Sequence, residues 1–455
     1  MRKMKDSGIE WIGEIPEDWE VKPIKSLFSF GKGLPITKDN LIENGSSVIS
    51  YGQIHSKNNI GVQIVDDLKR FVSETYLDTN PNSLVHKGDF IFADTSEDLE
   101  GCGNFVYVDK EEILFAGYHT IILFSKQNIN NKYLAYLFKT DAWRCQIRGL
   151  CSGVKLFSIS KKILGQTRII LPMVHEQQRI VDFLDRKCSE IDSVISKTRE
   201  TIEEYKKLKQ SIITEVVTGK VKIENEKACG KYDTYKDSGI EWIGEIPSEW
   251  EVKPIKALFS FGKGLPITKD NLTETGLSVI SYGQIHSKNN IGTEIRNELI
   301  RYVDKIYYET NPQSLVHKGD FIFADTSEDL IGCGNFVYVN REEDLFAGYH
   351  TIILFSKEKN DNKYLAYLFQ TDCWRRQIRC CCSGVKLFSI SRRILGSTNL
   401  ILPSILEQQQ ISDFLDQKCS EIDSLIAKKE QLVVELESYK KSLICEVVTG
   451  KKEMC

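Results

Sequence analysis

The heptapeptide KDSGIEW at residues 5–11 returns, letter for letter, at residues 236–242. Outward from this stretch, residues 5–220 recur at 236–451 with a constant offset of 231, and about 157 of the 216 aligned positions are identical. Solenoid units are much shorter, roughly 20 to 50 residues, and need more than two copies. The chain is therefore interpreted as a tandem duplication of one fold.

Length and composition exclude several classes of protein. A chain of 455 residues would suggest about three domains on length alone, and the repeat reduces that number to two. With 60 Lys and Arg against 64 Asp and Glu, the formal charge is −4, which excludes a protein that coats nucleic acid by bulk charge but permits a local basic face. We expect no membrane helix and no secretory signal, hence a cytoplasmic protein with reduced cysteines.

Each copy has a first part that mixes short strands with a helix. The runs 47–51, 89–92 and 120–124 are rich in β-branched and aromatic residues and predict strands. Apolar residues at helical spacing predict a single helix over 132–147, ended by Gly149. This part of about 155 residues is predicted to be an α+β domain with its own core.

The second part of each copy is predicted to be a long helix. Apolar residues recur every three or four positions from Ile180 to Val216, a stripe that includes Leu208, and again from Ile411 to Val447. Gly219 and Gly450 stand where a C-terminal cap belongs. About 42 residues make a rod of roughly 60 Å. Packing of the two rods on each other is favoured over packing of each rod on its own domain.

Catalytic and cofactor motifs are absent from the sequence. There is no P-loop, and the Gly31–Gly33 turn has the wrong spacing for a methyl-donor site. No C-x-x-C pair indicates a metal site, and Cys380–Cys382 is interpreted as local drift. A nucleophilic pair of Cys102 and His119 is conceivable but lacks a third group. We expect no catalytic residue, no metal and no cofactor.

A basic tract follows the predicted helix in both copies. No carboxylate occurs between Asp141 and Glu176, or between Asp372 and Glu407. Cations without acids suit contact with phosphates, although a solvated helix end and loop is the alternative. The phosphate candidates are Arg144, Arg148, Lys155, Lys161, Lys162, Arg375, Arg379, Lys386, Arg392 and Arg393.

Three features together resemble the specificity (S) subunit of type I restriction–modification systems. They are GIEWIGEIPEDWEVK at 8–22, LPMVHEQQRI at 171–180 and the rod ending EVVTGK at 215–220. Each returns in the second copy, as GIEWIGEIPSEWEVK at 239–253, LPSILEQQQI at 402–411 and EVVTGK at 446–451. The resemblance covers nearly the whole chain.

The resemblance implies a division of labour. Two globular target recognition domains would each read half of a double-stranded DNA site, and the rods would pair antiparallel as a spacer with pseudo-twofold symmetry. Methylation and cleavage would belong to methyltransferase (M) and restriction (R) subunits, so the chain itself would not be an enzyme. The implied segments are a first recognition domain at 1–175, a helix at 176–220, a linker at 221–235, a second recognition domain at 236–406 and a helix at 407–451.

Two near-identical recognition domains predict an unusual target. Twofold protein symmetry maps onto a palindromic site, so an interrupted inverted repeat is expected. A standalone DNA-binding regulator or a protein-only scaffold is the alternative. The candidates for contact with base edges are Gln53, Asn58, Asn59, Tyr118, His119, Gln284, Asn289, Asn290, Tyr349 and His350.

Overall fold

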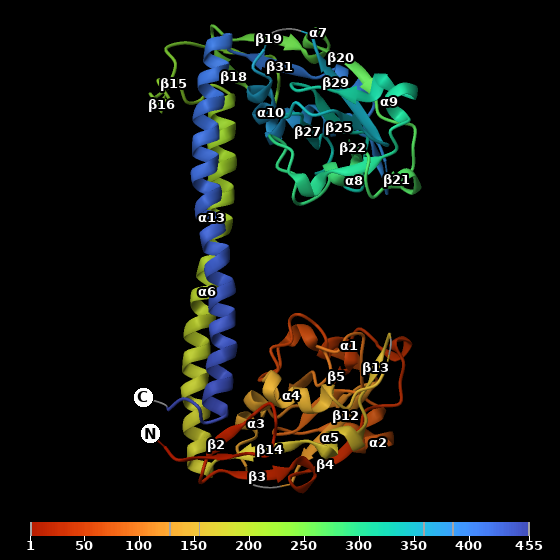
Figure 1. The fold of residues 1–455 in the computed structure, drawn as a ribbon, viewed down its shortest axis with the longest axis vertical. Coiled ribbons are helices and arrows are strands. Elements are labelled where there is room, and N and C mark those ends of the chain that lie inside the picture. Colours follow the sequence, from red (N-terminus) through yellow and green to blue (C-terminus); the bar gives the residue numbers. More distant parts are fainter. Residues whose placement is uncertain (1, 127–128, 154, 358–359, 385, 454–455) are drawn as a thin grey trace. The chain divides into compact units, whose positions relative to one another are not determined.

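The computed structural model describes residues 2–126, 129–153, 155–357, 360–384 and 386–453. Its contacts divide the chain into two units that do not follow chain order. Unit 1 joins residues 1–199 to 431–455, and unit 2 consists of residues 200–430. Each unit therefore holds one copy of the globular part, half of its own long helix and half of the other (Figure 1).

Two small sheets lie face to face in unit 1. The first has the order β10 (Phe105–Tyr107), β8 (Phe90–Ala93), β12 (Thr120–Ser125), β4 (Phe28–Lys32). The second has the order β6 (Arg70–Val72), β5 (Ser46–Ile49), β11 (Leu114–Ala116), β7 (Leu84–Val85). Short pairs join β1 (Met4–Asp6) to β2 (Glu14–Pro16), β3 (Glu20–Pro23) to β14 (Arg168–Leu171), and β9 (Thr95–Ser96) to β13 (Phe157–Ser158).

Strand alternation explains why β8 is apolar along its whole length. Ile91 packs into a core that also contains residues of β5 and β11, whereas Phe90 and Phe92 join the core formed by the helices. A strand that is covered on both faces reads as a continuous apolar run. The helices of unit 1 are α1 (Tyr51–Ile54), α2 (Tyr76–Thr79), α3 (Asn131–Phe138), α4 (Asp141–Arg148) and α5 (Lys161–Gln166).

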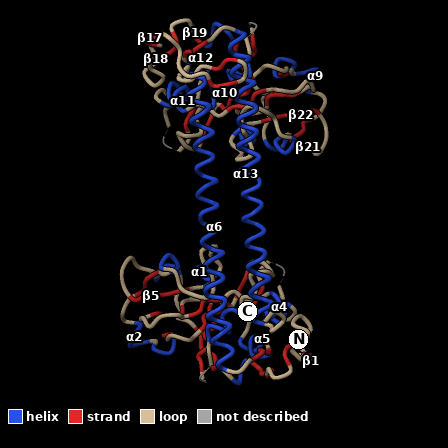
Figure 2. Tube along the Cα trace, turned by 90° about the vertical axis from the view of Figure 1, so that its left-hand side faces the viewer, coloured by secondary structure: helices blue, strands red, loops and turns tan. Residues whose placement is uncertain are grey.

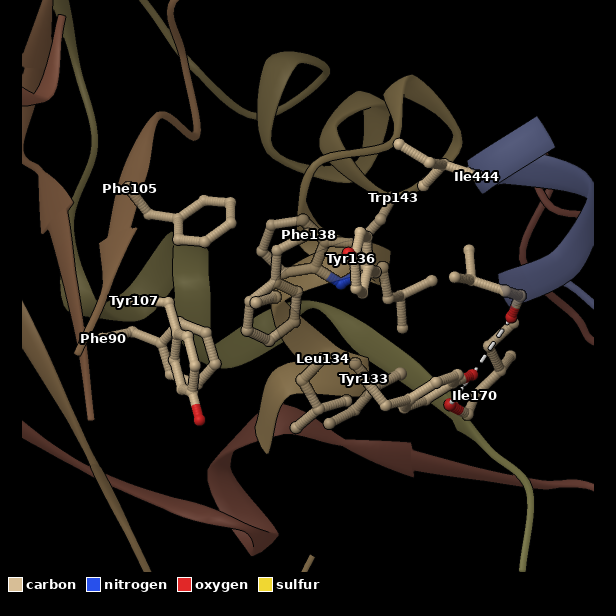
Figure 3. Packing of buried hydrophobic residues seen from close by; sticks show 14 of the residues in the cluster. Phe90, Phe105, Tyr107, Tyr133, Leu134, Tyr136, Phe138, Trp143, Ile170 and Ile444 are labelled. Atoms are coloured by element: carbon tan, nitrogen blue, oxygen red, sulfur yellow. Dashed lines mark hydrogen bonds between the residues drawn. The ribbon is translucent and has the colours of Figure 1, made fainter. Parts of the chain in front are cut away.

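An aromatic cluster joins this sheet to α3 and α4 (Figure 3). The rings of Phe138 and Trp143 lie 4.2 Å apart between centroids, and Phe90 lies 5.1 Å from Phe138. The prediction of one helix over 132–147 is wrong, because Thr140 accepts a hydrogen bond from the Trp143 N–H and begins a second helix. Both helices turn apolar residues inward, so spacing alone did not reveal the break.

Unit 2 repeats this architecture. One sheet has the order β20 (Phe259–Lys263), β29 (Thr351–Ser356), β25 (Phe321–Ala324), β27 (Phe336–Tyr338). The other has the order β21 (Leu272–Thr273), β23 (Arg301–Val303), β22 (Leu277–Ile280), β28 (Leu345–Ala347), β24 (Leu315–Val316). The short pairs are β17 (Tyr235–Asp237) with β18 (Glu245–Pro247), β19 (Glu251–Pro254) with β31 (Asn399–Leu402), and β26 (Thr326–Ser327) with β30 (Phe388–Ser389).

Short helices complete the second globular part, and a hairpin precedes it. The helices are α7 (Ile255–Leu258), α8 (Tyr282–Ile285), α9 (Tyr307–Thr310), α10 (Asn362–Gln370), α11 (Asp372–Arg379) and α12 (Arg392–Gly396), of which α10 to α12 correspond to α3 to α5. The segment between the copies forms the hairpin β15 (Ile223–Glu224) and β16 (Lys227–Ala228). Ile223 is buried, so this segment is anchored to unit 2.

The two long helices are α6 (Val174–Val217) and α13 (Ile405–Val448), and they pack together side by side (Figure 2). Within unit 1, Asp192 of α6 pairs with Lys440 of α13; within unit 2, Lys209 pairs with Asp423. Early residues of one helix thus meet late residues of the other, which makes the pair antiparallel. No helix in the described part of the chain is long and apolar enough to cross a membrane.

The predicted stripe is correct for most of its length but wrong at Leu208. That side chain is 48% exposed, and Ile213 is fully buried instead. Ile213 is buried because it packs into the core of the globular part of unit 2, together with Val216 and Val217. Gly219 and Gly450 have φ of +71° and +70°, as a C-terminal glycine cap requires.

Each globular part caps the end of the other copy's helix. The Tyr133 hydroxyl oxygen lies 3.0 Å from the carbonyl oxygens of Ile170 and Val448, the last residue of α13 (Figure 3). In unit 2, Tyr364 meets the carbonyl of Val217, the last residue of α6, at 3.2 Å. The last carbonyls of a helix lack hydrogen-bond donors within the helix, and these buried tyrosine hydroxyls supply such donors.

Candidate nucleic-acid interface

Strand pairing gathers several polar side chains at one edge of unit 1. β11 runs parallel to β5, so Tyr51, which follows β5, lies at the same end as Tyr118, which follows β11. β8 is antiparallel to β12, with Ala93 opposite Thr120, which brings Asp94 next to His119. These four residues come from three separate stretches of the chain, and only the sheets bring them together.

His119 is the most unusual residue of this edge. Its φ is +55°, a left-handed conformation that is uncommon for residues other than glycine, and its side chain is 58% exposed. The Nδ1 atom lies 3.2 Å from Asp94 Oδ1, and the ring packs edge-on against Tyr51 with centroids 5.4 Å apart. Because the carboxylate accepts from Nδ1, Nε2 is the ring nitrogen left to meet a ligand.

A second histidine, His55, packs edge-on against Tyr51 with ring centroids 6.4 Å apart. His55 Nε2 lies 2.8 Å from the carbonyl oxygen of Thr95, so Nε2 donates, and Nδ1 accepts from Asn104 Nδ2 at 3.0 Å. Both ring nitrogens are therefore used inside the protein. Sequence reasoning missed His55 and Tyr51 as members of this edge, since neither stands in a recognisable motif.

An open cleft of about 550 Å³ lies beside these residues. It is bordered by α1 and by the loop between β9 and β10, and Leu156, before β13, lines its remaining side. The lining residues are Tyr51, Gly52, His55, Ser96, Glu97, Asp98, Glu100, Gly101, Asn104 and Leu156.

Unit 2 reproduces the same contacts. His350 has a φ of +54° and lies 3.3 Å from Asp325, and its ring is 5.4 Å from that of Tyr282. His286 lies 2.8 Å from the Thr326 carbonyl and 3.1 Å from Asn335. A left-handed histidine held by a carboxylate is therefore present twice.

The remaining candidates for base contact have different surroundings. Asn59 Nδ2 donates to the carbonyls of Ile54 and Phe105, and its Oδ1 accepts from Gly61 N, so its amide is fully used within the protein. Gln53 Oε1 accepts from Ser50 N and caps α1. Asn58 is exposed. Gln284, Asn289 and Asn290 repeat these three environments, and Tyr349 repeats that of Tyr118.

The four candidate arginines on α4 and α11 are engaged within the protein. Arg144 Nε donates to the Phe138 carbonyl at 3.1 Å, and burial lowers the pKa of its guanidinium to about 10. Arg148 pairs with Asp141 and donates to the Glu100 carbonyl. Arg375 and Arg379 make the matching contacts with Phe369, Asp372 and Ile331. Contact of these arginines with phosphate stays a prediction.

The other cations of the tract are exposed in both units. Lys161 and Lys162 open α5, whose N-cap is Ser160, and Lys155 precedes β13. Lys386, Arg392 and Arg393 occupy the same places in unit 2. These six are the exposed members of the ten phosphate candidates, and Lys161 Nζ also lies 3.3 Å from the Phe30 carbonyl.

Nothing in the described residues forms a metal site, since no group of three or more His, Cys, Asp or Glu side chains could hold an ion. Cys102 is buried beside Cys151, and burial raises the pKa of the Cys102 thiol to about 12. His119 faces Asp94 instead of a thiol. The conceivable pair of Cys102 and His119 is therefore not formed.

Comparisons with known proteins identify a family for both copies. The family model described as "Type I restriction modification DNA specificity domain" matches residues 16–204 and again 247–435. The MjaX specificity subunit of Methanocaldococcus jannaschii, a putative type I restriction enzyme subunit, is 25% identical over 97% of this chain and 95% of the relative. The EcoKI specificity subunit of Escherichia coli is 20% identical over 96% and 90%. The MjaVIII subunit is 27% identical, but its match spans only 47% of this chain and 49% of the relative.

Solved structures share the fold. A chain from a study of complex assembly and conformational transition of the type I R-M system superposes with a TM-score of 0.70 at 16% identity, covering 96% of this chain and 99% of that one. The HsdS subunit from Thermoanaerobacter tengcongensis gives 0.52 at 16% identity, covering 96% and 98%. With the family model matched over both copies, the chain belongs to the type I restriction modification DNA specificity domain family.

Proposed function

We propose that this chain is the DNA-reading subunit of a type I restriction–modification complex and that it recognises two half-sites arranged as an interrupted inverted repeat. Methyl transfer and cleavage are carried out by the M and R subunits that it docks. The chain is not itself an enzyme, and it acts in the cytoplasm, where its target DNA lies.

The observation that carries this proposal is that both units contain the same polar edge, which in unit 1 consists of Tyr51, Asp94, Tyr118 and His119. His119 with Asp94 and His350 with Asp325 present the same groups in the same geometry. Antiparallel pairing of two like helices favours a symmetric target, because a twofold operation exchanges the partners. Near-identical readers on such a pair call for nearly equal half-sites in inverted order.

Exposed cations supply the contact with the DNA backbone. Lys155, Lys161 and Lys162 lie near the cleft-lining Leu156 in sequence, in a stretch free of carboxylates. Phosphate contacts position a protein on the duplex, and base-edge contacts then specify the sequence. We assign the phosphate role first to these lysines and to Lys386, Arg392 and Arg393, whose side chains are exposed.

The paired helices are assigned to subunit docking. In unit 1 the side chains of Val194 and Val434 are exposed on the paired helices, as is that of Tyr439, whose ring lies 5.9 Å from Lys452 Nζ. The match of the family model over both copies favours the assembled complex over a standalone regulator.

Methylation-aware sequencing of host DNA tests the proposal directly. The chain and its M subunit would be co-expressed in a host without adenine methylation, and the modified motif determined. Two half-sites related by inversion are expected. Two unrelated half-sites would contradict the symmetric target, and unmodified DNA together with no duplex binding would contradict the function itself.

Salt dependence tests the phosphate contacts. In the complex, Lys161→Ala should reduce the slope of log K against log salt by about 1 if the lysine neutralises one phosphate. Arg144→Ala tests the sequence-based prediction for the buried arginine. Lys227→Ala is the matched control, because Lys227 is exposed in the linker hairpin, away from the tract. An unchanged slope for Lys161→Ala would remove it from the interface.

A further inference from the structure

We infer that Glu100 and Ile331 make the two half-sites differ at a single base pair, with C·G where Glu100 reads and T·A where Ile331 reads. The inference rests on the proposed function and refines it. It predicts an inverted repeat that is broken at one defined position.

The cleft itself points to this pair. Ten residues line it in unit 1, and nine of them have the same residue type at the equivalent position in unit 2. The exception is Glu100, which is replaced by Ile331. Residues 83–108 match 314–339 at every other position, so this exchange is isolated within a long identical block.

Two contacts hold the backbone at this position in both units, although the hydroxyls of Ser96 and Ser327 bond differently within the loop. Asp98 Oδ1 accepts from Gly101 N at 2.6 Å, and Asp329 Oδ1 accepts from Gly332 N at 2.6 Å. Arg148 Nη2 donates to the Glu100 carbonyl at 2.9 Å, and the equivalent arginine donates to the Ile331 carbonyl at 2.9 Å. The two units thus present different side chains from equivalent loops that share these two contacts.

Arg148 is accordingly a positioning residue for the loop. Its side chain is only 19% exposed and its other partner is Asp141, at 2.8 Å. A guanidinium that bridges α4 and the loop fixes where the side chain at position 100 emerges. This supports precise placement of that side chain, which base readout requires.

Both side chains are exposed and therefore accessible to a ligand. Ile331 is 75% exposed, the largest exposure among the exposed large apolar side chains of the described residues, and neighbouring Leu330 is 43% exposed. In the major groove an apolar side chain contacts the thymine methyl group, whereas a Glu carboxylate accepts from the cytosine N4 amino group. The exchange of Glu for Ile therefore changes the preferred pair from C·G to T·A.

The experiment uses the complete chain with its M subunit. The methylated motif is determined for the natural chain, for Glu100→Ile and for Ile331→Glu. Both substitutions introduce a residue that the equivalent loop already carries, so folding is not at issue, and equal melting temperatures check this. Purified complexes are then titrated with duplexes that carry C·G or T·A at the variable position of either half-site.

The expected results are specific. The natural motif has C·G in one half and T·A in the other at equivalent positions. Glu100→Ile makes both halves T·A, Ile331→Glu makes both C·G, and each substitution switches the duplex preference by on the order of ten- to a hundredfold. Ile113→Asp, which also copies the residue of the other unit at an exposed position but outside the cleft, leaves the motif unchanged.

Two results would overturn the inference while leaving the proposed function intact. One is a natural motif whose halves are identical at every position. The other is a difference between halves that persists in both substituted chains. Absence of any modified motif or duplex binding would instead remove the proposed function, and this inference with it.

Discussion

The two units share one fold, but their contacts agree closely at the polar edge and differ at the start of each long helix. At the polar edge their contacts agree within 0.1 Å, as in His119–Asp94 at 3.2 Å and His350–Asp325 at 3.3 Å. At the start of each long helix the partners have changed. Glu176 accepts from Trp19 and pairs with Arg2, whereas Glu407 accepts from Trp250 and from the Tyr232 hydroxyl.

This difference shows which interactions the repeat must keep. The tryptophan–glutamate contact is retained in both units at 3.1 and 3.2 Å, because it fixes the helix to its globular part. The second partner comes from the chain terminus in one case and from the linker in the other, where the sequence surroundings differ. A single carboxylate thus accommodates a cation or a phenol without a change in the fold.

The largest effect is expected from opening the aromatic cores. Phe138→Ala should lower the free energy of unfolding by about 3 to 5 kcal/mol, since it removes a buried ring packed against Trp143 and Phe90. Phe369→Ala should cost the same within about 1 kcal/mol if the two cores are energetically equivalent. Chemical denaturation of the full chain measures both values. Unequal costs would show that near-identical contacts hide unequal packing.

Next in size is the helix-end glycine. Gly450→Ala should cost about 3 kcal/mol, because a left-handed backbone disfavours a Cβ by about 1 to 2 kcal/mol and the added atom would lie 2.5 Å from Pro16 Cδ. Gly13→Ala is the control. Its φ is also +70°, but no atom lies within 4 Å of the new Cβ, so only the backbone cost remains. Equal decreases in melting temperature for the two variants would show that the contact with Pro16 adds nothing to the cost.

A smaller loss of stability tests whether each globular part caps the end of the other copy's long helix. Tyr133→Phe removes the hydroxyl that meets the Val448 carbonyl and should cost about 1 to 2 kcal/mol. Tyr364→Phe should behave alike through Val217. Hydrogen exchange at the ends of α13 and α6 would report the loosened turns. If Tyr133→Phe loosened α6 and left α13 protected, the proposed exchange of caps would be wrong.

The smallest effect belongs to the helix pair. Asp192→Ala and Asp423→Ala each remove a partly exposed ion pair with Lys440 and Lys209, and each should cost less than about 1 kcal/mol. Added salt should shrink the loss further. Double-mutant cycles with the lysines measure the pair energy. A coupling energy well above that figure, unaffected by salt, would mean that these pairs are more than surface contacts.

Much of this protein follows from the sequence alone. Duplication shows itself as identity at a fixed offset, strands such as 120–124 as short apolar runs, and the long helices as apolar residues at regular spacing closed by Gly219 and Gly450. These are local signals, because a helix or strand reports its buried face through the periodicity of its own residues. The family resemblance rests on the same local stretches.

Tertiary structure decided what depends on residues far apart in the chain. The pairing of β5 with β11 and of β8 with β12 brings Tyr51 and Asp94 to His119. The Arg144 side chain is turned inward and donates to the Phe138 carbonyl, although the carboxylate-free stretch around it predicted a cation that contacts phosphate. Antiparallel packing of the helices placed Val448 under Tyr133, across more than 300 residues. Such contacts are selected by the combined packing of several elements, which no single stretch of sequence encodes.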